Sequence, residues 1–297
     1  MSFGAALEKY KQGVQVQKRW WSLGSEKYEK AVQCFEAAAN LYRLDNKLDL
    51  AGEATEQAAL MYLKLDSKYE AATALVKAAI LYRKMNPTAT IKLYQHAIEI
   101  YSELGKFPMV ARNQLQLAEM YEELLDYAAA IHLYENAAEC FDIDTNAVSA
   151  RKCLTKVAEL SATLERYDRA IEIYQGLAQQ QLTHTATKWN VSTTFFRTGL
   201  CYLANQDLIG LKRSLEVWKE MSPGFDRKRE AIFLQNILTI IEEPSTPHRY
   251  TELCHDYDSA STLDSLTVAL LLRIKINLIM TPTTSSATSN PIPEDYC

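Results

Sequence analysis

The sequence repeats itself about every 40 residues, and this repeat restricts the fold more than any other feature. Four segments open with the pattern Tyr–(Glu/Asp/Ala)–x–Ala, and they start at Tyr28, Tyr69, Tyr127 and Tyr167. Within each segment the apolar residues recur at the three- and four-residue spacing of one helix face. A fixed period of this length, filled by amphipathic helices, is typical of a solenoid of stacked helical hairpins.

Helices of a second kind are expected between these segments, so that each repeat forms a hairpin. They are the stretches AGEATEQAALMYL from Ala51, ARNQLQLAEMYEEL from Ala111 and ARKCLTKVAEL from Ala150. Small residues at the contact positions let neighbouring helices approach closely, and aromatic residues fill the space beside them. The alanines expected at these contacts are Ala38, Ala79, Ala97 and Ala138. We therefore interpret the stripes of alanine and aromatic residues as core rather than as a ligand site.

The composition favours an all-α protein. The 297 residues include only 9 glycines and 8 prolines, and of the prolines only Pro87 and Pro108 precede residue 220. Both stand where the first turn of a helix is expected, a position at which proline removes no helical hydrogen bond. The net charge of −5 argues against a generally basic nucleic-acid-binding protein.

The repeat fades after about residue 185, and a different helical arrangement is expected beyond it. Helices are predicted near residues 188–204, 206–221, 227–242, 247–257 and 262–279. The last stretch is rich in proline, serine and threonine without an apolar period, which predicts disorder. The predicted organisation is a helical-hairpin solenoid over 1–185, a C-terminal helical bundle over 186–280 and a disordered tail over 281–297.

The sequence contains no residues at the spacing of a catalytic or metal-binding motif. The five histidines are isolated, and the glycines never cluster into a phosphate-binding loop. The six cysteines lack metal or redox spacing and are expected to be reduced thiols, as in the cytosol. No signal peptide and no apolar run long enough to span a bilayer are found. We expect a cytoplasmic, non-enzymatic protein without a cofactor, a metal or a small-molecule substrate.

Two stretches carry an uneven distribution of charge. Residues 113–150 contain eight acidic residues and no lysine or arginine, and Arg151, Lys152 and Lys156 follow directly. Lys152 and Lys156 are four residues apart and therefore share one helix face. Taken alone, either stretch is also consistent with an ordinary solvated helix face.

A tryptophan pair follows two cations in the segment Lys18-Arg19-Trp20-Trp21-Ser22-Leu23-Gly24. One interpretation is a buried helix end. The other is an exposed loop that inserts into lipid, because indole rings favour the membrane interface and cations favour anionic headgroups. The residues alone leave both interpretations open.

Several segments, taken in order, resemble the soluble NSF attachment proteins, the SNAP adaptors of membrane fusion, and the alpha and beta types more than the gamma type. The resemblance covers roughly residues 15–277 and is carried by AAANLYRL, DSKYEAAT, AIEIYSELGKF, AEMYEE, SARKCLTKVAEL, RYDRAIEIYQ, TTFFRTGLCYL, YTELCHDYDSASTLD and LLLRIK. It implies an all-α, tetratricopeptide-like, right-handed solenoid of antiparallel helical hairpins closed by a C-terminal helical bundle. This fold agrees with the repeat.

The resemblance also implies an adaptor function. In this family several copies surround the SNARE bundle left after fusion, which syntaxin-type, synaptobrevin-type and SNAP-25-type helices form. The bound copies recruit the hexameric ATPase NSF, which pulls the bundle apart. The implied partners are therefore the SNARE complex, the NSF hexamer and a membrane surface, with peripheral membrane association and a role in vesicle-mediated transport such as ER–Golgi transport.

The resemblance assigns three groups of residues to these partners. Lys106, Arg112, Lys152 and Lys156 match basic positions that grip SNAREs; Trp20 and Trp21, with Leu23, stand where the family's membrane loop carries a phenylalanine pair; Asp207, Glu242 and Glu243 match acidic positions that face NSF. The sequence departs from the family at its last residues, where a leucine beside an acidic tail is replaced by Pro-Glu-Asp-Tyr-Cys. We therefore expect weak stimulation of ATP hydrolysis by NSF.

The competing class is a tetratricopeptide scaffold such as a chaperone cofactor that clamps a C-terminal carboxylate. Such a clamp needs lysine, asparagine and arginine residues that converge within consecutive 34-residue repeats. The period near 40 and the expected C-terminal bundle argue against it.

Overall fold

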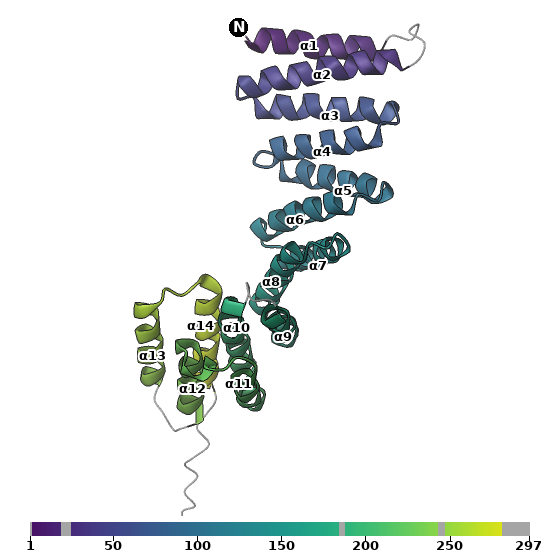
Figure 1. Ribbon diagram of the computed structural model, residues 1–297. Helices are drawn as coiled ribbons and strands as arrows, with labels where there is room; N and C mark the ends of the chain where they lie inside the picture. Colours follow the sequence, from purple (N-terminus) through teal and green to yellow (C-terminus); the bar gives the residue numbers. More distant parts are fainter. Residues whose placement is uncertain (1, 19–24, 184–187, 243–246, 281–297) are drawn as a thin grey trace, which may run out of the picture. The chain divides into compact units, whose positions relative to one another are not determined.

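A computed structural model describes residues 2–18, 25–183, 188–242 and 247–280. Within these ranges the chain forms fourteen α-helices and two short 3-10 helices and contains no strand, so the all-α prediction is confirmed (Figure 1). The α-helices are α1 (Ser2–Gln17), α2 (Glu26–Leu44), α3 (Leu48–Lys64), α4 (Lys68–Tyr82), α5 (Pro87–Glu103), α6 (Phe107–Glu123), α7 (Tyr127–Ile143), α8 (Ala147–Thr163), α9 (Tyr167–Thr183), α10 (Val191–Ala204), α11 (Leu208–Met221), α12 (Arg229–Glu242), α13 (Pro247–Ala260) and α14 (Ser265–Met280). The 3-10 helices are η1 (Lys188–Asn190) and η2 (Phe225–Arg227).

The chain divides into two compact units. The first, Met1–Leu154, contains α1 to α7 and the beginning of α8; the second, Thr155–Cys297, contains the rest of α8 and the later helices. In the first unit each helix packs antiparallel against the next, which produces the expected row of hairpins (Figure 1). The division inside α8 reflects packing contacts, whereas the predicted boundary at 185 reflects the end of the repeat and stays a prediction.

The turns between helices are built alike. Helices α3 to α9 begin 19 or 20 residues apart, so one helix and its turn make half of the 40-residue repeat. Two residues before each of seven helices, one residue adopts a left-handed conformation with φ between 56° and 64°. These residues are Asn46, Asp66, Gly105, Leu125, Thr145, Glu165 and Gln206.

Each left-handed residue ends the preceding helix in a Schellman motif. In the turn from α2 to α3 the amide of Asn46 donates to the carbonyl of Arg43 at 3.0 Å, and the amide of Lys47 donates to that of Tyr42 at 2.9 Å. The same two bonds recur at all seven turns. An aromatic residue holds the position of Tyr42 in six of them: Tyr42, Tyr62, Tyr101, Tyr121, Phe141 and Tyr202.

Several helix starts are fixed by side chains that accept backbone hydrogen bonds. Asn86, Asp126 and Asp207 each accept from the amide three residues on, at 3.1, 3.1 and 2.8 Å. Pro87 occupies the first position of α5, and Pro108 lies in the first turn of α6, as predicted. The helix boundaries therefore follow from local capping chemistry.

Alanine and tyrosine fill the core of the first unit, as the sequence predicts. Ala38, Ala79 and Ala97 are completely buried, and Ala138 is nearly so. The largest side chains buried beside such alanines are Tyr94, Tyr101 and Tyr134. Small residues at the contacts and large ones in the gaps give close packing without voids.

The second unit uses phenylalanine and tryptophan instead. Phe195 stacks on Trp218 with ring centroids 4.8 Å apart, and Phe225 meets Phe195 edge-on at 5.1 Å. The last two helices are shifted from their predicted ranges, because α13 extends to Ala260 and α14 begins only at Ser265. Asp264 sets this start by accepting a hydrogen bond from the amide of Thr267 at 2.7 Å.

Two glycine-to-alanine substitutions test the account of the turns. Gly105 has a φ of +64° and open space where a Cβ would stand, so Gly105→Ala adds only backbone strain. We expect it to lower the free energy of unfolding by about 1 kcal/mol. Gly176 lies inside α9 with the same open space, and Gly176→Ala should raise stability by about 0.5–1 kcal/mol. Chemical denaturation followed by circular dichroism measures both; equal effects at the two sites would refute the account.

Candidate protein-binding surfaces

The four basic residues assigned to SNARE binding lie at α6 and α8. Lys106 directly precedes α6, Arg112 lies in the second turn of α6, and both are exposed. Lys152 is exposed on α8. Lys156 follows one turn later, half-buried, with its Nζ atom 3.8 Å from Oε2 of Glu159. The structure therefore leaves the first three cations accessible and ties the fourth to a neighbouring acid.

Arg112 and Lys152 occupy equivalent places in successive hairpins. Each is the sixth residue of its helix, and the two are 40 residues apart. The beginning of α8 lies close to α6, because the negative charge of Glu119 on α6 acts on the thiol of Cys153. Burial, with a smaller contribution from Glu119, raises the pKa of Cys153 to about 11. Equivalent positions on neighbouring helices of one row present their side chains on the same face.

The repeat also identifies a cation that the sequence analysis missed. Lys77 is the tenth residue of α4, the place that Lys156 occupies in α8, and its side chain is exposed. The signal that could have found it is the helix register rather than any string of residues. Gln116 holds the same place in α6.

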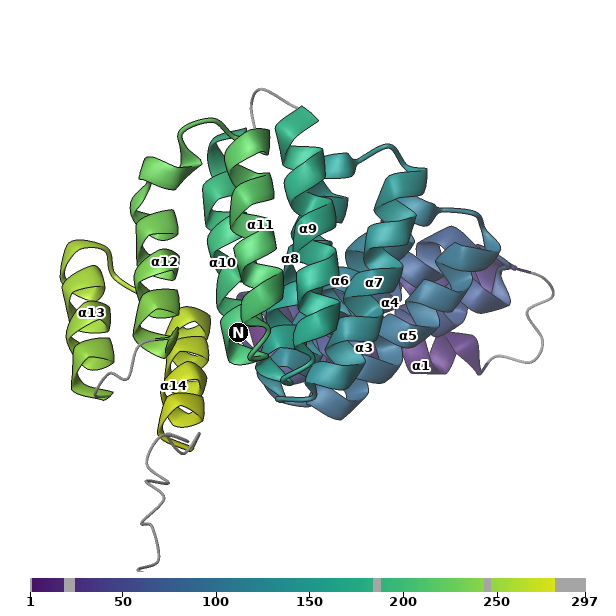
Figure 2. The same cartoon turned by 90° about the horizontal axis from the view of Figure 1, so that it is seen from below.

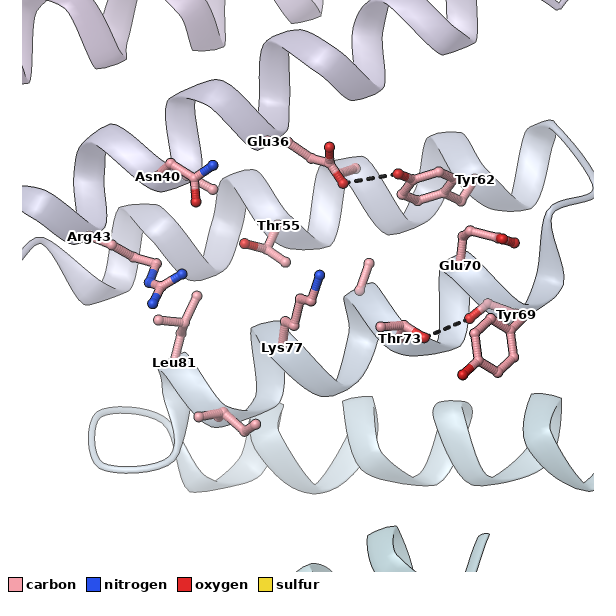
Figure 3. Close-up of a pocket in the computed structure, with 14 residues that line it drawn as sticks. Glu36, Asn40, Arg43, Thr55, Tyr62, Tyr69, Glu70, Thr73, Lys77 and Leu81 are labelled. Atoms are coloured by element: carbon pink, nitrogen blue, oxygen red, sulfur yellow. Dashed lines mark hydrogen bonds between the residues drawn. The ribbon is translucent and has the colours of Figure 1, made fainter. Parts of the chain in front are cut away.

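A groove of about 500 Å³ runs between α2 and α4, with α3 as its floor (Figure 3). Alanines and a threonine make it deep, since small side chains leave room between the helices: Ala39, Thr55, Ala58 and Ala74. Arg43 and Lys77 reach into it from opposite walls (Figure 3). The arrangement suits a segment that carries a carboxylate.

Tyr62 fixes one acid of this groove. Its hydroxyl donates to Glu36 at 2.9 Å. Burial and the bond to Glu36 raise the pKa of Tyr62 to about 12, so the hydroxyl stays protonated and remains a donor at neutral pH. Glu36 is thereby held on the α2 wall by a side chain of α3.

Much of the acidic stretch 113–150 is engaged within the first unit. Arg83 on α4 binds Glu123 at 2.8 Å and lies 3.9 Å from Glu119. Tyr134 donates to Glu122 at 2.8 Å, and Asp126 caps α7. These contacts support the interpretation of this stretch as structural rather than as a free anionic surface.

In the second unit, an ion-pair network holds the end of α8. Arg197 on α10 pairs with Glu159 of α8 and, at 3.0 Å, with Asp264 just before α14. Glu159 is also the partner of Lys156. Lys156 therefore belongs to a network that links three elements, which distinguishes it from the freely exposed Lys152.

The acidic residues assigned to NSF lie at one end of the bundle. Asp207 caps α11, so part of its carboxylate is used within the fold. Glu242 is the last residue of α12 and forms an ion pair with Lys212 of α11. The structure thus brings Asp207 and Glu242 together around the first turns of α11. Glu243 lies outside the described residues.

Several other predictions concern residues outside the described ranges. They include the membrane-attachment residues Trp20, Trp21 and Leu23 and the tail 281–297. Among the residues that the structure does describe, no helix is both long and apolar enough to cross a bilayer. The same residues contain no group of three or more side chains able to hold a metal ion.

The fold and these surfaces define a helical-repeat protein whose accessible features are charged helix faces and an open groove. The sequence profile described as "Soluble NSF attachment protein, SNAP" matches residues 5–279. The chain belongs to the soluble NSF attachment protein family, as its resemblance indicated.

Two curated relatives show the extent of this similarity. The alpha-soluble NSF attachment protein of Mus musculus is 36% identical over 85% of this chain and 85% of its own length. A protein of Schizosaccharomyces pombe named "Probable vesicular-fusion protein sec17 homolog" is 35% identical over 86% of this chain and 88% of its own. Among solved structures, the apo form of RapI covers 91% of this chain and 79% of that chain at 13% identity, with a TM-score of 0.48.

Proposed function

We propose that this protein is an adaptor that binds assembled SNARE complexes and recruits the ATPase NSF, which disassembles them during vesicle fusion and membrane trafficking. The observation that carries the proposal is the pair Arg112 and Lys152. The two cations are exposed and hold equivalent places on neighbouring helices, in a chain that belongs to the NSF attachment protein family. A row of cations at such a spacing fits the acidic surface of a long helical bundle.

The energetics explain why several weak contacts suffice. An exposed ion pair contributes only about 0.2–1 kcal/mol, so no single cation holds the SNARE complex. Lys106, Arg112 and Lys152 act together, and several bound copies add their contributions through the shared bundle. Lys77 continues the set on α4, beside the groove between α2 and α4.

NSF is the partner proposed for the acidic end of the second unit. Asp207 and Glu242 would meet a basic surface of the ATPase, and charge complementarity of this kind mainly sets orientation and association rate. Stimulation of ATP hydrolysis is a separate step, which we expect to be weak. The proposed location is the cytoplasm, with peripheral attachment to membranes.

A capture experiment tests the proposal. Immobilised, assembled SNARE complex should retain this protein, and should retain NSF without ATP hydrolysis only when this protein is present. Retention should fall steeply between about 50 and 500 mM salt, because exposed charges are screened. A chaperone C-terminal peptide serves as the control ligand for the alternative class. Capture of that peptide, with no retention by SNAREs at low salt, would contradict the proposal.

Membrane attachment is proposed for the segment that contains Trp20 and Trp21. Tryptophan favours the membrane interface, and the preceding cations favour anionic lipids. Replacing both tryptophans with serine should slow SNARE disassembly on liposomes more than disassembly of soluble SNAREs. The melting temperature should stay nearly unchanged. A large fall in melting temperature would show instead that the two indoles belong to the core.

A further inference from the structure

The last helix exposes an apolar face. Five apolar residues of α14, each between 37% and 75% exposed, fall within one side of the helix: Val268, Leu272, Ile276, Ile279 and Met280. The opposite side is buried against the bundle through Leu270, Leu271 and Ile274. We call the five exposed residues the outer face of α14.

A neighbouring helix shows that this pattern is not general in the bundle. The exposed positions of α12 are mostly polar: after Ile232 they are Gln235, Asn236, Thr239 and Glu242. A helix that is apolar all round is normally buried on all sides. The outer face of α14 therefore has the composition of a surface that a partner covers.

The outer face ends beside the acidic residues proposed to meet NSF. The side-chain amide of Asn277 on α14 donates to the carbonyl of Ala204 at the end of α10, at 3.0 Å. Asp207 follows three residues after Ala204, and Glu242 pairs with Lys212 in the same helix that Asp207 caps. The C-terminal ends of α12 and α14 lie at this end of the bundle in both views (Figures 1 and 2).

Charge alone cannot account for stable recruitment at this end. One exposed ion pair strengthens association by about two- to fivefold, so three give about a hundredfold at most. Micromolar binding corresponds to about a millionfold over the 1 M standard state. Docking surfaces that hold generally combine an apolar centre with a charged rim.

We propose that the outer face of α14 is the apolar part of the surface that docks the ATPase, with Asp207 and Glu242 on its rim. This inference rests on the proposed function. The partner surface that fits is an apolar patch bordered by lysine or arginine. The acids orient the ATPase, and burial of the outer face of α14 slows its dissociation.

The test compares two matched pairs of exposed apolar residues. Leu272→Ser with Ile279→Ser removes apolar surface from the outer face of α14. The control, Val217→Ser with Ile232→Ser, removes exposed apolar residues from α11 and α12. Retention of NSF on SNARE complexes is measured without ATP hydrolysis, together with SNARE binding and the unfolding midpoint. The first pair should weaken NSF retention at least tenfold and leave SNARE binding unchanged, whereas the control should change neither.

A second variant covers the case in which the first pair unfolds. Met280→Ser changes the most exposed of the five residues, and it should weaken NSF retention about threefold at an unchanged midpoint. The inference is overturned if these variants retain NSF normally while Glu242→Lys loses it, in which case the proposed function stands. It is also overturned if sedimentation shows that a second copy covers this face, or if vesicle flotation shows that lipid does. Failure of the unmodified protein to recruit NSF would instead refute the proposed function.

Discussion

Replacing Arg112 and Lys152 together with glutamate is expected to weaken binding to assembled SNARE complexes by more than tenfold per bound copy. Each change removes an attraction of about 0.2–1 kcal/mol and adds a repulsion of similar size, and tenfold corresponds to about 1.4 kcal/mol. Because several copies share one bundle, the losses multiply and capture should nearly vanish. Both side chains are exposed, so the unfolding midpoint should not change. Capture on immobilised SNARE complex measures the effect.

A charge-matched control separates the location of the cations from the net charge. Lys92→Glu with Lys219→Glu changes the net charge by the same amount on α5 and α11, where both lysines are exposed. This variant should bind SNARE complexes almost as well as the unmodified protein. Equal losses in the two variants would mean that only the overall charge matters, and the assignment of Arg112 and Lys152 would be wrong.

Reversal of Glu242 to lysine is expected to abolish recruitment of NSF to SNARE complexes while SNARE binding persists. The substitution removes a docking charge and places a second cation beside Lys212, which presents a positive surface to a basic partner. Glu242 is a sharper probe than Asp207, because loss of the α11 cap at Asp207 also costs about 1 kcal/mol of stability. Retention of NSF without ATP hydrolysis measures the effect.

A charge exchange distinguishes docking from local pairing. The double variant Lys212→Glu with Glu242→Lys restores the ion pair between α11 and α12 in the opposite orientation. If Glu242 acts through stability, the exchange should restore NSF recruitment. If Glu242 contacts the ATPase, recruitment should stay low at a restored unfolding midpoint, and this is the outcome that we expect.

The fold could be predicted from sequence because the repeat is local and periodic. The spacing of Tyr28, Tyr69, Tyr127 and Tyr167 determined the hairpin, and the buried alanines follow from helix contact geometry. The turns could not be predicted from glycine, because only Gly105 of the seven left-handed positions is a glycine. Their reliable signal is the aromatic residue four positions before the left-handed one, whose carbonyl accepts the longer Schellman bond.

The charged surfaces could be predicted only in part, because the pairing of side chains depends on contacts between helices. Nothing in the sequence links Lys212 with Glu242, 30 residues away, or Arg83 with Glu123, 40 residues away. These contacts show which charges the fold itself engages. Lys77 escaped notice because its significance lies in helix register, and the outer face of α14 because an apolar run in sequence predicts burial rather than exposure.

Reconstituted disassembly tests the central claim most directly. A SNARE complex that carries a fluorescent donor and acceptor is mixed with NSF and ATP, with and without this protein. We expect the energy transfer to fall only when this protein, NSF and ATP are all present, and to persist with the Arg112→Glu, Lys152→Glu variant. Unchanged energy transfer with the unmodified, folded protein, or disassembly at the same rate in its absence, would contradict the account.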